Sequence, residues 1–98
     1  MNQQQYYLGK LSEEGIEVAH ISLKTQQFGA HEMMPGQPFS NYERCHQELD
    51  DMMAMIEELN EKFDFGYVPN RERIEAKKAK VKKFLEYSVS LGLVKGVV

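Results

Sequence analysis

The sequence predicts an all-α fold, a helical bundle of three main helices completed by oligomerisation. Three observations support this prediction. Apolar residues recur every three to four positions in three long segments, which is the period of an amphipathic helix. Capping residues and stretches rich in Pro and Gly separate these segments, and no segment alternates polar and apolar residues as a half-buried strand does. With 98 residues, the chain is expected to form a single domain over 1–98.

The first helix is predicted from about Gln4 to Phe28, with Gly29 as a left-handed cap. Glu14 falls within the main apolar face of this helix, and Glu17 lies on one flank of that face. The apolar members of the face are Tyr7, Leu11, Val18, Ile21 and Phe28. A second apolar strip lies on the opposite side and consists of Leu8, Ile16, Ala19 and Leu23. A helix that is apolar on two sides is sandwiched, so the strip predicts a homo-oligomer.

Residues 29–40 are predicted to form a loop, because Pro35, Gly36 and Pro38 are incompatible with regular structure. At twelve residues the loop is long for a helix–helix connection, and long loops often carry function. Two interpretations remain open. The loop is either a lid over a bound ligand or a plug in which its Met and Phe side chains pack.

The second helix is predicted to begin after Ser40, which forms a capping-box pattern with Glu43, and to end at about Phe63. Gly66 is the expected cap of its C-terminus. The third helix should follow Asn70 as N-cap and extend to about residue 91. The predicted inner face of the third helix consists of Ile74, Val81, Phe84, Leu85 and Ser88.

The second helix also carries two acids on or near its apolar stripe, Glu48 at the edge and Asp51 on the flank. The stripe consists of Cys45, Leu49, Met52, Met55, Ile56, Leu59 and Phe63. Acids on an apolar face need a compensating partner, because ionised carboxylates about 5 Å apart repel by roughly 3 kcal/mol at an effective dielectric of 20. Glu14, Glu17, Glu48 and Asp51 together therefore predict a site for a divalent cation. Oxygen-only ligands favour Mg²⁺, with Mn²⁺ as the alternative ion. The opposing interpretation is that the four acids rim the edge of a core and stay hydrated.

Basic residues are concentrated near the third helix, where residues 70–83 contain seven Lys/Arg and two Glu. Lys77 and Lys78 lie at or near the apolar phase of that helix, and Lys10 precedes Glu14 by one turn on the same face. These three lysines are candidates for contact with phosphate oxygens. The alternative is an ordinary solvated face.

Composition excludes several other classes of protein. A net charge of −3 argues against stable nucleic-acid binding, and no apolar run is long enough to span a bilayer. One cysteine excludes an internal disulfide and fits a reducing cytoplasm, where we expect the protein to be located. Cys45 and His46 are adjacent on a helix and point about 100° apart, so they do not form a catalytic dyad.

Segments 10–19 (KLSEEGIEVA) and 47–52 (QELDDM) resemble the ExxE…ExxD signature of the MazG-like all-α nucleoside triphosphate pyrophosphohydrolases. The resemblance extends from about residue 7 to residue 59. It implies a dimer or tetramer that binds Mg²⁺ through Glu14, Glu17, Glu48 and Asp51 and converts (d)NTP to (d)NMP and pyrophosphate. One carboxylate is expected to orient the attacking water, with Glu13, Glu14 and Glu17 as alternatives.

Two features depart from the family pattern. The connector of 30 residues between Glu17 and Glu48 is longer than usual, and Val81 or Lys80 stands where the last helix commonly has asparagine. The competing functional prediction is a non-catalytic helical module that binds a protein partner or senses nucleotides.

Overall fold

The computed structural model describes residues 1–96, which contain three α-helices and no β-strand. Helix α1 spans Gln3–Phe28, α2 spans Asn41–Phe63 and α3 spans Arg71–Ser90. The all-α prediction is therefore confirmed. The chain divides into a first unit, Met1–Tyr67, and a second unit that begins at Val68. Within residues 1–96, no helix has the length and apolar character needed to cross a membrane.

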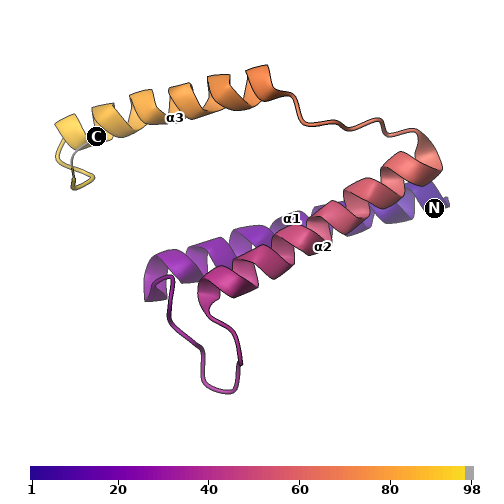
Figure 1. Ribbon diagram of the computed structural model, residues 1–98, viewed down its shortest axis with the longest axis horizontal. Helices are drawn as coiled ribbons and strands as arrows, with labels where there is room; N and C mark the ends of the chain where they lie inside the picture. The colour runs from indigo at the N-terminus through magenta and orange to yellow at the C-terminus, as the bar shows by residue number, and fades with distance from the viewer. Residues whose placement is uncertain (97–98) are drawn as a thin grey trace. The chain divides into compact units, whose positions relative to one another are not determined.

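In the first unit, α1 and α2 lie side by side and run antiparallel, joined at one end by the loop of residues 29–40 (Figure 1). The buried apolar side chains of this pair are Ile21 and Leu59, which are 4% and 0% exposed. Other side chains along the seam are half-buried, namely Tyr7, Leu11, Val18, Met52, Met55, Ile56 and Phe63. Two helices can cover only one stripe of each other, so the core is a single thin seam.

The helix N-termini confirm the predicted caps. The Ser40 hydroxyl accepts the Glu43 N–H at 3.2 Å, and the Glu43 carboxylate accepts the Ser40 N–H at 3.0 Å. The bond that the Ser40 backbone N–H donates to the carboxylate is the largest cause that holds the pKa of Glu43 below its usual value. The Asn70 side chain accepts the Arg73 N–H at 3.0 Å and so caps α3. Each cap satisfies a backbone N–H that the helix itself leaves unpaired.

The C-terminal caps differ from the predictions. Gly29 follows α1 with φ 97° and ψ 160°, so it has the positive φ that favours glycine but not the left-handed helical conformation. At the end of α2, the left-handed residue is Asp64, with φ 53° and ψ 35°, rather than Gly66. Aspartate tolerates this conformation better than most residues. The predicted cap at Gly66 is therefore wrong, because the chain has already turned two residues earlier.

The face of α2 that meets α1 agrees with the predicted stripe except at Leu49. Leu49, expected on the apolar stripe, is 49% exposed, whereas Glu48 is half-buried. Phe28 of α1, also expected to pack, is 58% exposed. The other six members of the predicted stripe are buried or half-buried, and Asn41 and Glu48 join them; the six are Cys45, Met52, Met55, Ile56, Leu59 and Phe63. The periodicity of one helix does not specify which edge residues of its apolar face touch the partner helix. The position of the partner helix decides that.

The other predicted apolar surfaces are exposed in the single chain. Leu8, Ile16 and Leu23 of the second α1 strip are 41%, 64% and 63% exposed. On α3, Val81, Phe84 and Leu85 are 53%, 55% and 40% exposed, and the helix buries no residue.

The loop of residues 29–40 is held by hydrogen bonds rather than by a plug. Met33, Met34 and Phe39 are all at least 40% exposed, so the interpretation in which they pack as a plug is wrong. Instead, the Asn41 N–H donates to the Glu32 carbonyl, and the Tyr42 N–H donates to Ala30, each at 3.1 Å. These bonds tie the loop to the first turn of α2. Whether the loop acts as a lid stays a prediction.

Candidate metal centre

Three of the four predicted ligands come together between α1 and α2. One carboxylate oxygen from each of Glu14, Glu48 and Asp51 can be chosen so that all three lie within 4.8 Å of one another. Helix α1 supplies Glu14. Helix α2 supplies Glu48 and Asp51, whose spacing of three residues places them on the same side of the helix. Two segments distant in sequence thus contribute to one acidic site.

The three acids differ in burial. Glu14 and Glu48 are half-buried along the seam, and Asp51 is exposed. Glu48 occupies a position of the inward stripe where the neighbouring positions, Cys45 and Met52, are apolar. A charged side chain at such a position costs stability unless a partner compensates it. The site therefore sits at the boundary between the seam and solvent.

The electrostatics of the site show that its negative charges repel. Partial burial raises the pKa of Glu48, and the charges of Asp51, Glu17 and Glu14 raise it further. Only Arg44 acts in the opposite direction, and its effect is the smallest. Binding of a cation would remove this repulsion, because an opposite charge favours the ionised form.

Salt bridges do not provide the compensation. Among residues 1–96, the acids found in ion pairs are Glu13, Glu58 and Glu75. None of the four predicted ligands is among them. The three converging acids thus form no ion pair among the described residues.

Glu17 is exposed and is not one of the three residues whose oxygens converge. Its charge nevertheless acts on Glu48, so the two side chains are near each other. Its role as a fourth ligand stays a prediction.

The donor set fits a hard divalent cation. Mg²⁺ takes oxygen ligands at about 2.1 Å in octahedral geometry, so neighbouring ligands are about 3 Å apart. The three oxygens lie within 4.8 Å of one another, so the side chains would have to move closer together to share one ion. Two of the acids are only half-buried and the third is exposed, which leaves room for such a change of rotamer.

The predicted phosphate-contacting lysines are engaged elsewhere or belong to the second unit. Lys10 Nζ pairs with Glu13 at 3.2 Å and lies 5.4 Å from the centre of the Tyr6 ring. The hydrogen bond to Glu13 is the main cause of the raised pKa of Lys10. On α3, Lys78 pairs with Glu75 at 3.3 Å, and Lys77 lines a shallow hollow of the helix surface. Their contact with a substrate stays a prediction.

The sequence analysis missed Arg44, the one cation whose charge lowers the pKa of Glu48. It also missed Asn41, a polar residue that is 1% exposed. The spacing of four residues between Arg44 and Glu48 is a signal that could have identified the arginine. No comparable local signal exists for Asn41, because its partners lie in the preceding loop.

Comparison with known proteins adds no relative: no protein-family model, no curated protein and no solved structure matches this chain.

Proposed function

We propose that this protein is a Mg²⁺-dependent, MazG-like nucleoside triphosphate pyrophosphohydrolase that converts (d)NTP to (d)NMP and pyrophosphate. One observation carries the proposal. Glu14, Glu48 and Asp51 converge from two helices, and they occupy positions named by the ExxE…ExxD pattern of the sequence. A pattern match alone requires no such convergence.

Each part of the site has a role in this reaction. A bound divalent cation supplies charge neutralisation for the triphosphate and activates water at neutral pH. Glu14, Glu48 and Asp51 would hold the ion between the helices, and Glu17 would complete the set. Glu13 and Glu17 are both exposed and are the candidates to accept a hydrogen bond from the attacking water. The water adds its oxygen to the α-phosphorus and gives up a proton to the carboxylate that orients it, from which the proton passes to solvent. The bond from the α-phosphorus to the bridging oxygen breaks, and pyrophosphate leaves with that oxygen.

The proposal is tested by pyrophosphate release from each (d)NTP in the presence of Mg²⁺ or Mn²⁺. Glu48→Gln and Asp51→Asn should each lower kcat/KM by at least about 100-fold, since loss of a group that stabilises the transition state typically costs that much. Glu57→Gln is the matched control, because this exposed acid of α2 lies outside the converging set. Activity that survives Glu48→Gln would reject the site. Binding of triphosphate without turnover would favour the nucleotide-sensing alternative.

Assembly of this protein into a homo-oligomer, a dimer or tetramer, is part of the proposal. Ile16 and Leu23 of α1 are 64% and 63% exposed, while the helix pair buries only two apolar side chains. Below about 70–80 residues a single core is rarely sufficient for stability, and the first unit is of that size. Ile16→Lys should therefore lower the sedimentation coefficient, with Gln3→Lys at the exposed start of α1 as control. A wild-type monomer would contradict this assembly. A cytoplasmic location is also proposed, and it is supported by the free thiol of Cys45.

A further inference from the structure

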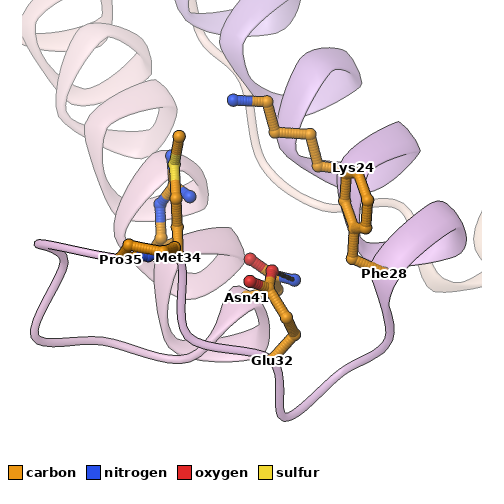
Figure 2. Close-up of a pocket in the computed structure, with 7 residues that line it drawn as sticks. Lys24, Phe28, Glu32, Met34, Pro35 and Asn41 are labelled. Carbon is orange, nitrogen blue, oxygen red and sulfur yellow. Dashed lines mark hydrogen bonds between the residues drawn. The ribbon is translucent and has the colours of Figure 1, made fainter.

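A cavity of about 240 Å³ opens where the loop of residues 29–40 joins the two helices of the first unit (Figure 2). Its apolar lining comes from Phe28 at the end of α1 and from Met34 and Pro35 in the loop. Pockets that enclose drug-sized ligands measure roughly 300–1,000 Å³, so this one fits a single ring system better than a whole nucleotide. The side chains of Phe28 and Met34 are exposed because both face this open space.

The polar floor of the cavity offers acceptors. Asn41 is 1% exposed, and its Nδ2 donates to the Gly29 carbonyl at 2.9 Å and to the Glu32 carboxylate at 3.0 Å. Figure 2 shows Glu32 and Asn41 together at the base of the pocket. These two bonds use both amide hydrogens of Asn41, and an ionised carboxylate donates none. A ligand therefore meets oxygen acceptors here and must supply the donor itself.

Two cations stand at the rim of the same cavity, Lys24 from α1 and Arg44 from α2. Neither forms an ion pair within residues 1–96. The Lys24 ammonium reaches away from α1 towards the space between the helices (Figure 2). Arg44 precedes Glu48 by one helical turn, so the rim of the cavity adjoins the candidate metal centre. An anionic group that extends from the cavity towards the three acids passes these cations.

We infer that this cavity receives the base of the nucleotide and selects bases that carry an exocyclic amino group. The inference rests on the proposed function. Phe28, Met34 and Pro35 provide apolar contact for a flat ring, and Glu32 accepts a hydrogen bond from the amino group. Lys24 and Arg44 neutralise the adjoining phosphates. Cytosine and uracil have the same ring but present an amino group and a carbonyl at this edge, so cytosine should bind and uracil should be repelled by the carboxylate.

The test measures the binding of CMP and of UMP to the full chain. Binding is monitored by NMR titration without added metal. The wild-type protein should bind CMP about tenfold more tightly than UMP, the lower range for one hydrogen bond to a charged group. Glu32→Gln keeps an oxygen acceptor for Asn41 and adds a donor, so it should reduce this ratio to near one or reverse it. Glu57→Gln makes the same charge change on the outer side of α2 and should leave the ratio as in the wild type.

Equal binding of CMP and UMP, or a ratio that Glu32→Gln does not change, would overturn the inference. Absence of any CMP binding would overturn it as well. The proposed function fails separately, because it requires pyrophosphate release that depends on Glu48, and nucleoside monophosphates test no turnover. Pyrophosphate release at equal kcat/KM from dCTP and dTTP would leave the hydrolase standing without this base selection. Circular dichroism of Glu32→Gln confirms that the loop substitution leaves the helices folded.

Discussion

Two regions of the seam between α1 and α2 differ in how their charges are compensated. Near the start of α1, Lys62 donates a hydrogen bond to the Tyr7 hydroxyl at 3.2 Å, pairs with Glu58 and lies 5.1 Å from the centre of the Tyr7 ring. Further along the seam, Glu14 and Glu48 form no ion pair with any residue of the described range 1–96. In the first region the charges are compensated within the chain. In the second region the negative charges are left available to a bound cation.

This difference separates stability from function. A compensated cluster adds modestly to stability through packing and hydrogen bonds. A cluster of charges without such compensation lowers the free energy of unfolding. Natural proteins retain such clusters where binding of a ligand offsets this loss. The aromatic end should therefore respond to mutation through folding, and the acidic region through ligand binding.

The largest effect expected is stabilisation of the wild-type protein by Mg²⁺ or Mn²⁺. At an ion concentration 100 times Kd, binding to the folded state alone adds about 2.7 kcal/mol to the free energy of unfolding. Thermal unfolding with and without EDTA measures it. Glu48→Gln should abolish the stabilisation, and Lys62→Met should retain it. Equal stabilisation of wild type and Glu48→Gln would mean that the ion binds elsewhere. The contrast drawn between the two regions of the seam would then not hold.

At the aromatic end, Tyr7→Ala should lower the free energy of unfolding by about 2 kcal/mol, since a half-buried ring is lost. This ring lies 5.9 Å from that of Phe63, centre to centre. Tyr7→Phe removes only the hydroxyl that accepts from Lys62 and should cost about 0.5–1 kcal/mol. Urea unfolding distinguishes the two variants. Similar losses for both would mean that the hydroxyl, not the ring, stabilises this end.

Without a divalent cation, Glu48→Gln should stabilise the protein at pH 7 by about 1 kcal/mol, the repulsion of two charges 4 Å apart in water. The pKa of Glu48 is raised in the folded state, so the folded state holds its proton to higher pH than the unfolded state. Wild-type stability therefore falls as the pH rises from the ordinary glutamate pKa through the raised one. The advantage of the variant should disappear below about pH 4, where both forms are neutral. An advantage that persists at low pH would exclude charge as its cause.

The smallest effects concern two glycines inside α1. Alanine at Gly9 or Gly15 should each add about 0.5–1 kcal/mol, because alanine is the better helix former. A new Cβ at either position meets nothing within 4 Å, so the close helix approach considered for Gly15 does not occur within this chain. Thermal unfolding of both variants sharpens the comparison of the two regions. Loss of stability in Gly15→Ala alone would indicate a second subunit packed beside the acidic site.

How much the sequence could predict depends on the range of the interactions involved. The starts of α2 and α3 followed from the caps Ser40 and Asn70, whose hydrogen bonds reach only three residues along the chain. The pairing of Glu48 with Asp51 followed from helical spacing for the same reason. That Glu14 faces the partner helix was also visible from the periodicity of its apolar neighbours.

Other features were decided by tertiary structure. Which of the neighbours Glu48 and Leu49 is half-buried and which is exposed depends on where α1 lies, and no residue of α2 encodes that alone. The cavity near Phe28 exists because buried Asn41 fastens the preceding loop to α2. Local hydrogen bonds and helical periodicity are fixed by neighbouring residues, so the sequence determined the helices and their acids. Contacts between distant segments determined which of these acids converge.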